Sequence, residues 1–273
     1  MARRRTLSDV SHDLTIGALA TVGLVVLVGP VIVVLMTSLS TSQALKFPPP
    51  GFSLQWYEAL FDVSRSRHIH VAAWNSLTVA LWATTAATIL SVLAAVSIAR
   101  VRTSSARALE AAFLAPLILP TIAYGLAALM FFSLLGYRPS LLLLTIGHLV
   151  VIAPFIFRTT LASLSQLDPV LIEGSASLGA NQAYTFRRVT LPIIAPGIVA
   201  GAFLAFVNSL DNVPVSLFLT NARTDMLPIR MWGMIESTLD VRVAAISGLL
   251  IVCVLVLMIV LDRLVGLTRR ISG

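Results

Sequence analysis

The chain has 273 residues, of which 58% are hydrophobic and only 11% are charged. Soluble domains are close to half apolar and a quarter charged, so this composition excludes a water-soluble globule. The net charge of +7 would suggest an acidic partner for a soluble protein, but an uneven distribution of basic residues across a membrane explains it without a nucleic acid.

Long apolar stretches indicate membrane-spanning helices. A helix rising about 1.5 Å per residue needs roughly 20 apolar residues to cross about 30 Å of hydrocarbon. Six stretches meet or approach this length: Leu14–Leu39, Val71–Ala99, Ala111–Tyr137, Leu141–Phe157, Leu191–Leu210 and Val243–Leu261. We therefore expect an all-α integral membrane protein with six transmembrane helices in one domain, residues 14–265, between tails at 1–13 and 266–273. The first stretch follows a basic start but continues too far for a cleaved signal peptide, so we expect an uncleaved anchor.

The basic residues are unevenly divided when successive loops are assigned to alternate sides. Twelve of the 19 fall on the side of both termini: Arg3, Arg4, Arg5, Arg100, Arg102, Arg107, Arg158, Arg187, Arg188, Arg263, Arg269 and Arg270. Cytoplasmic loops carry the excess of Lys and Arg. We therefore expect both termini, and the loop at about 158–192, to face the cytoplasm.

Two proline-containing regions modify this plan. Pro116 and Pro120 lie inside the third stretch, where we expect kinks, because proline removes a backbone donor. Outside the spans, Lys46–Gly51 is expected to be extended. The aromatic and aliphatic residues of Phe52–Phe61 suit a short helix at the outer interface.

The loop between the fourth and fifth stretches has clear helix boundaries. Asp168 followed by Pro169 is a strong helix start, and Gly179 is a natural left-handed end. Asn181 can cap a second helix running to about Thr190. The sequence therefore predicts a helix-turn-helix elbow at the cytoplasmic surface, suited to receive mechanical work from a soluble partner.

The same loop carries a spaced motif. Glu173, Gly179, Val189, Leu191 and Pro192 fall at matching places of the signature loop of ABC importer permeases, which reads Glu-Ala-Ala, three residues, Gly, nine residues, Ile, any residue, Leu-Pro. Gly174 and Ser175 replace its two alanines. Further matches are Phe52–Tyr57, Asn75–Leu77, Ser209–Asp211 and Leu227–Trp232. Together these residues resemble the spermidine/putrescine branch of that family over nearly the whole chain after Leu14.

The resemblance implies a type I ABC importer permease fold in a bacterial inner membrane. It implies four partners besides lipid: a second permease subunit, two ATPase subunits and an extracytoplasmic solute-binding protein. The residues that would couple to the ATPase are Glu173, Gly179, Asn181, Arg187, Leu191 and Pro192. Arg187 and Arg188 could instead be positive anchors at the membrane surface. ATP and Mg would bind to the ATPase, since this chain has no glycine-rich phosphate loop and no cofactor of its own is expected.

Polar residues inside spans are candidates for the transport pathway, because they are costly in lipid. Asp211 is the sharpest, since about 20 helical residues above Leu191 place it near the outer end of the fifth stretch, where a carboxylate could meet a cationic solute. A helix break before Pro214 would explain it equally well. Asn208 and Asn75 could line the path or join helices, and Tyr124 could stack on a solute or simply pack. His148 is expected to be a satisfied interhelical donor rather than a metal ligand.

Two other classes of protein and several solutes remain open. An intramembrane serine protease needs a Ser and a His within the bilayer, but the best serine candidates, Ser175 and Ser177, lie in the elbow. A stand-alone channel or secondary transporter would leave the elbow unexplained. The resemblance favours a small cationic solute such as a polyamine, with iron, thiamine, phosphonates and opines as alternatives.

Overall fold

The computed structural model describes residues 7–99, 101 and 103–265, and most of them are helical. The arginines at positions 3–5, 100, 102, 269 and 270, which we expect to face the cytoplasm, lie outside the described residues. The same holds for the tail 266–273. The elements in chain order are α1 (Leu7–Ser38), α2 (Gln55–Phe61), α3 (Val63–Ala99), α4 (Ser104–Leu114), η1 (Ala115–Leu117), α5 (Thr121–Leu134), α6 (Leu141–Ser165), α7 (Pro169–Ser177), α8 (Gln182–Thr185), η2 (Phe186–Thr190), α9 (Leu191–Leu210), α10 (Val213–Leu219), α11 (Leu227–Thr238) and α12 (Arg242–Val265). Within the described residues they form two compact units, residues 7–66 with 234–252, and residues 67–99, 101 and 103–233 with 253–265.

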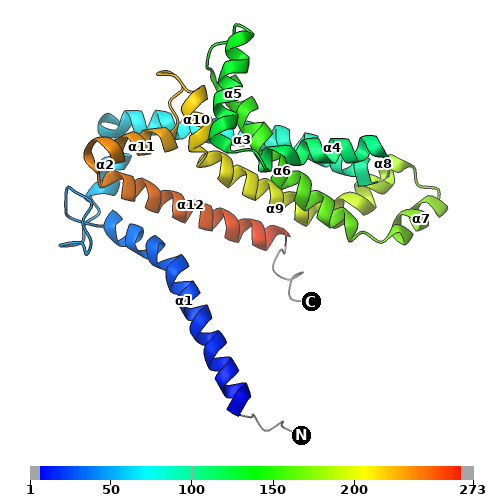
Figure 1. Cartoon of the computed structure of the whole chain (residues 1–273), viewed down its shortest axis with the longest axis horizontal. Coiled ribbons are helices and arrows are strands. Elements are labelled where there is room, and N and C mark those ends of the chain that lie inside the picture. The colour runs from blue at the N-terminus through cyan, green and yellow to red at the C-terminus, as the bar shows by residue number, and fades with distance from the viewer. Residues whose placement is uncertain (1–6, 100, 102, 266–273) are drawn as a thin grey trace. The chain divides into compact units, whose positions relative to one another are not determined.

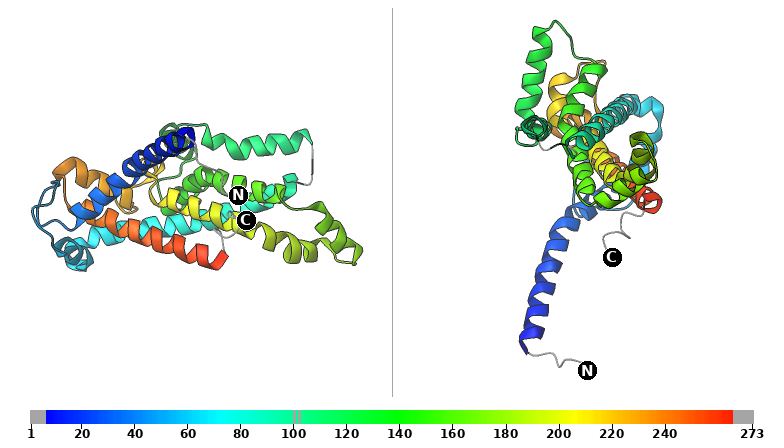
Figure 2. Two further views of the ribbon diagram at one scale, coloured as in Figure 1. Left: turned by 90° about the horizontal axis from the view of Figure 1, so that it is seen from below. Right: turned by 90° about the vertical axis from the view of Figure 1, so that its right-hand side faces the viewer.

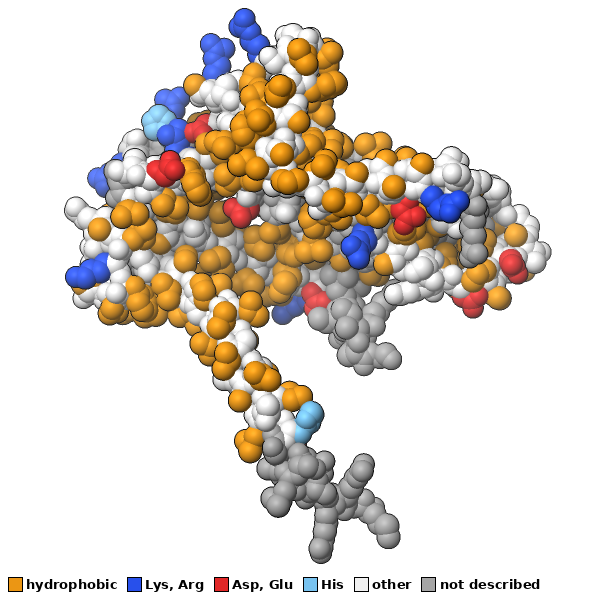
Figure 3. All heavy atoms as spheres, in the orientation of Figure 1, with side chains coloured by type: hydrophobic (Ala, Val, Ile, Leu, Met, Phe, Trp, Pro, Cys, Tyr) orange, Lys and Arg blue, Asp and Glu red, His pale blue; other side chains and the backbone are white. Residues whose placement is uncertain are grey.

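The apolar helices account for five of the expected spans. Within the described residues, five helices are long and apolar enough to cross a membrane, and the bent pair formed by α4 and α5 adds a sixth candidate. Exposed apolar side chains lie along α1 between Leu14 and Val33 and along α5 (Figure 3). Side chains that apolar and that exposed require lipid or a protein partner around them. The chain is therefore an all-α, multi-pass membrane protein.

The third expected span is not a single kinked helix. Between α4 and α5 the chain bends by 106°, with the short 3₁₀ turn η1 leading into the break. Pro116 and Pro120 remove backbone donors, and Leu119, which precedes a proline, is disfavoured in the helical region. The kink expected near Pro116 and Pro120 is confirmed, and it is sharp enough to divide the stretch into two helices.

The first unit holds α2 through its aromatic residues. Trp56 Nε1 donates a hydrogen bond of 2.8 Å to the Ser40 carbonyl oxygen, and Tyr57 Oη donates one of 2.9 Å to Ser38 Oγ. Leu60 is buried on the same helix. The prediction of a short helix in Phe52–Phe61 is confirmed, with Gln55 as its first residue.

The second unit is built around α6 and α9, which lie side by side in both views (Figures 1 and 2). Gly197 and Gly201, one turn apart on α9, face Ser163 and Thr159 of α6 with no room for a side chain between them. Small residues at this spacing let two membrane helices approach closely. This pair forms the scaffold that separates the elbow at one end of α9 from Asp211 at the other.

Candidate functional site

The first arm of the elbow forms as its boundary residues predict. Asp168 Oδ1 accepts a hydrogen bond of 2.9 Å from the Val170 N–H, and Pro169 is the first helical residue of α7. The helix ends after Ser177, and Gly179 has a φ of +82°. Only glycine adopts that conformation without a steric cost, so the turn depends on this residue.

The second arm is longer than expected. Asn181 Oδ1 caps α8 by accepting a hydrogen bond of 2.8 Å from the Tyr184 N–H. The helix does not end near Thr190, as predicted, but continues from Gln182 to Leu210. Pro192 has no N–H and its ring crowds the carbonyl four residues earlier. The wider π-helical turn η2 precedes it and accommodates this residue, with the Leu191 N–H donating to the Phe186 carbonyl oxygen.

One of the two positions that differ from the family motif joins the two arms. Ser175 Oγ and Thr185 Oγ1 form a hydrogen bond of 2.9 Å between α7 and α8, which alanine could not make. The other, Gly174, is exposed, with open space where a Cβ would stand. The elbow is therefore fastened by a side-chain bond that the alanines of the motif do not provide.

The outer surface of the elbow combines apolar side chains with charge. Leu178 is 90% exposed, and Val170, Leu171 and Tyr184 are also exposed. Glu173, Arg187 and Arg188 are exposed on the same segment. In Figure 1, α7 lies at the end of α6 farthest from α10. An apolar patch with charged neighbours at the tip of a bundle is the composition of a protein-docking surface.

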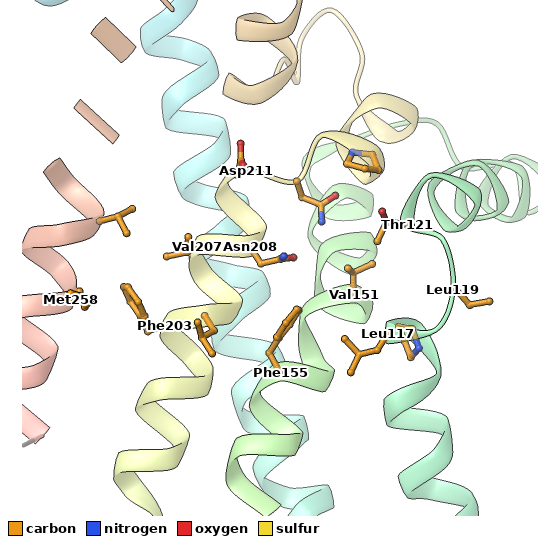
Figure 4. A pocket seen from close by; sticks show the side chains of 15 residues that line it. Leu117, Leu119, Thr121, Val151, Phe155, Phe203, Val207, Asn208, Asp211 and Met258 are labelled. Atoms are coloured by element: carbon orange, nitrogen blue, oxygen red, sulfur yellow. The ribbon is translucent and has the colours of Figure 1, made fainter. Parts of the chain in front are cut away.

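A cavity of about 610 Å³ lies at the opposite end of α9 (Figure 4). Its lining residues come from η1, α5, α6, α9, α12 and the start of α10: Pro116, Leu117, Leu119, Thr121, Val151, Phe155, Phe203, Leu204, Val207, Asn208, Asp211, Asn212, Pro214, Val254 and Met258. The walls are mainly apolar and Asp211 is the one carboxylate among them. Cavities of this size hold small organic molecules, oriented by a few polar groups.

The four pathway candidates separate into two pairs. Asp211 and Asn208 line the cavity. Asn75 instead donates a hydrogen bond of 2.9 Å to the Asp225 carbonyl oxygen, and Tyr124 Oη donates one of 3.3 Å to the Gly147 carbonyl oxygen. Neither of these two lines the cavity, and each ties its helix to another segment.

His148 lies fully buried on α6 between two serines. Its Nδ1 is 2.8 Å from Ser209 Oγ and its Nε2 is 3.1 Å from Ser216 Oγ. This confirms the expected satisfied histidine, with partners that the sequence did not identify. A serine beside a histidine is also a hydrolase arrangement, but all three side chains have no exposed surface and none lines the cavity. No substrate could reach them in this structure. Among the described residues, no three His, Cys, Asp or Glu side chains are grouped to hold a metal ion.

Two aromatic residues that line the cavity were not identified from the sequence. Phe155 and Phe203 come from α6 and α9 and line it below Asp211 in Figure 4. Both lie in spans that are apolar on every side, so hydropathy gave no signal for the face they occupy.

Comparisons with known proteins agree with this architecture. Residues 87–270 match a family model described as binding-protein-dependent transport system inner membrane component. The spermidine/putrescine transport system permease protein PotC of Haemophilus influenzae is 29% identical over 239 residues, covering 88% of this chain and 91% of that protein. The putrescine transport system permease protein PotI of Escherichia coli is 27% identical over 236 residues, covering 84% and 83%. A chain of a bacterial alginate ABC transporter, solved with a periplasmic protein bound to an alginate pentasaccharide, superposes with a TM-score of 0.71 at 17% identity, covering 99% of both chains.

Proposed function

The chain belongs to the family of binding-protein-dependent transport system inner membrane components, and from that premise we propose that it is the permease subunit of an ATP-driven ABC importer. It forms half of a translocation pathway, beside a second permease, and couples to two ATPase subunits through the elbow. An extracytoplasmic binding protein delivers the solute. The membrane is the bacterial inner membrane, with both termini and the elbow in the cytoplasm.

The observation that carries this proposal is the elbow itself. Exposed Leu178 stands beside the left-handed Gly179, and exposed Glu173 lies on the preceding helix. Leu178 is 90% exposed and Val170, Leu171 and Tyr184 of the same elbow are exposed as well, and several exposed apolar side chains on one segment favour contact with a partner. The second arm then runs without interruption into α9, so a force on the elbow reaches the cavity.

The solute is proposed to be small and cationic, such as spermidine or putrescine. Two relatives are permeases of systems named for these polyamines. Asp211 offers a carboxylate to an ammonium group, and Phe155 and Phe203 offer aromatic faces that favour cations. Asn208 adds a neutral hydrogen-bonding group in the same cavity.

The test is purification of the tagged protein from its native membrane, followed by measurement of ATP-dependent uptake. The wild-type chain should bring down a second permease and an ATPase. Replacing Glu173 by Ala together with Gly179 by Trp should remove the ATPase and abolish uptake, while membrane insertion persists. Glu236→Ala is the matched control, because Glu236 is an exposed glutamate on α11, outside the elbow. Normal uptake in the elbow variant would refute the coupling role, and recovery of the chain alone would favour a self-sufficient channel or transporter.

A further inference from the structure

Two residues at the cavity separate α9 from α10. α9 ends at Leu210, Asp211 leaves the helical conformation with φ −107° and ψ 17°, and α10 begins at Val213. Asn212 Oδ1 caps α10 by accepting a hydrogen bond of 3.0 Å from the Val215 N–H. Two polar cavity residues, Asp211 and Asn212, therefore make up the break.

One side chain bonds to both sides of this break. Ser209 lies two residues before Asp211, and Ser216 lies four residues after Asn212. His148 bonds to Ser209 through Nδ1 and to Ser216 through Nε2. A neutral imidazole has one N–H donor and one acceptor nitrogen, so one serine donates and the other accepts. Either tautomer fixes the end of α9 and the start of α10 to the same ring of α6.

The surrounding contacts hold α10 against this ring. A Cβ at Gly147 would lie 2.6 Å from Leu219 Cδ1 and 3.1 Å from Val215 Cγ1, so α10 rests on α6 beside His148. On α5, a Cβ at Gly125 would lie 2.7 Å from the Pro214 carbonyl oxygen. These contacts hold α10 against both α5 and α6, at the two glycines that leave room for it, directly after the break.

Packing alone does not account for a histidine here. An apolar side chain would fill the site without burying three polar groups, which are tolerated only when each is hydrogen-bonded. We propose that His148 is a positioning residue for transport: through Ser209 and Ser216 it holds the two-residue break so that Asp211 faces the cavity. This inference rests on the proposed function, in which Asp211 meets the solute.

The first test measures the position of the break without any solute. Cys253 is the single cysteine, so Cys253→Ser gives a background without cysteine. In this background Asp211→Cys reports on the break. Leu204→Cys reports on the same cavity, two helical turns before Asp211. The full complex in membrane vesicles is labelled with a small water-soluble maleimide. Ser209→Ala and Ser216→Ala should each change the labelling rate at position 211 by about fivefold, the ratio that corresponds to one hydrogen bond of ordinary net strength. The rate at position 204 should stay the same.

Ser91→Ala is the matched control for loss of a buried hydroxyl. Ser91 Oγ donates a hydrogen bond of 3.0 Å to the Ala153 carbonyl oxygen of α6 and is fully buried, but it does not contact the break. This variant should leave both labelling rates unchanged. Equal rates at position 211 in all backgrounds would overturn the proposal, as would equal changes at positions 204 and 211.

The second test uses uptake of radiolabelled spermidine with Asp211 intact. Loss of either serine should raise KM by about fivefold with a smaller effect on maximal rate. With both serines present, His148→Gln keeps a donor and an acceptor and should leave KM close to the wild-type value. His148→Leu keeps neither and should raise KM. An unchanged KM in both serine variants, with a lowered maximal rate, would refute the positioning role. Absence of ATP-dependent spermidine uptake by the wild-type complex, with the labelling result intact, would refute the proposed solute and leave the attachment of the break in place.

Discussion

A valine at position 201 tests the close packing of α6 and α9. An ideal Cβ on Gly201 overlaps Thr159 Oγ1 and lies 2.8 Å from Ile156 Cα, whereas ordinary contacts begin at 3.4 Å. The threonine can rotate, at the loss of its hydrogen bonds to the carbonyl oxygens of Phe155 and Ile156. The Ile156 backbone cannot rotate away, so the two helices must separate by about 0.6 Å, the shortfall between those two distances.

Overpacking of this kind costs about 1 to 3 kcal/mol, and valine brings two further methyl groups and little gain in helix propensity. Gly201→Val should therefore lose about 3 kcal/mol, or roughly 6–12 °C in the temperature at which half of the detergent-solubilised protein aggregates. Gly23→Val is the matched control, because a Cβ at Gly23 on α1 has nothing within 4 Å. Melting temperatures within about 2 °C of each other for the two variants would refute the packing argument.

A second substitution separates the two contacts. Gly201→Ala should be milder than valine, because about 1 kcal/mol of helix propensity offsets part of the clash. Adding Thr159→Ala removes the overlap with the hydroxyl and should recover part of the loss, while the contact with Ile156 remains. Full recovery would mean that the side chain, not the backbone, limits the approach of the helices.

Two further predictions concern the elbow and the first unit. Gly179→Ala should destabilise the elbow by about 1 to 2 kcal/mol through the left-handed backbone alone, because nothing lies near a Cβ at this position. Faster amide hydrogen exchange across residues 180–185 would show this loss, and unchanged exchange would contradict it. Asp240 is half-buried, which raises the pKa of its carboxyl, but hydrogen bonds from Arg242 outweigh burial and leave that pKa below its ordinary value. A lowered folded pKa contributes stability above the unfolded pKa of about 3.9, and this is lost as pH falls through the folded value. Arg242→Ala should therefore lower the melting temperature at pH 7, and this effect should shrink as the pH falls through the lowered folded pKa of Asp240. An effect that does not shrink on acidification would contradict the pairing.

Hydropathy predicted where the membrane helices are, but less well where they end. The stretch Leu191–Leu210 coincides with α9, which begins after the π-helical turn η2 and ends at the break before α10. In contrast, α3 begins at Val63, eight residues before the expected Val71. A charge-free window detects apolar length and gives no signal for the short polar turn that precedes the kink at Ser66, where φ is −123° and ψ is 21°.

Which side of a span faces the cavity was not predictable from the sequence. Helix arithmetic located Asp211 near one end of α9, and the cavity is there. Tyr124 lies on a helix that is apolar almost throughout, and the polar residues of the helix with Asn75 are not confined to one face, so the hydropathy pattern gives neither residue a direction. The partners of His148 are 61 and 68 residues away, and no sequence period connects them.

In the proposed function, the helix that runs from Gln182 through the π-helical turn to Leu210 would act as a lever arm. Its 29 residues span about 43 Å at the helical rise. A tilt of about 10° at the elbow end would sweep the far end through about 7 Å, more than the width of an alkyl chain. In the proposed function, such a tilt would be a movement large enough to open or close passage beside Asp211. Because Gly197 and Gly201 pack closely against α6, α6 and α9 would move together as a rigid pair.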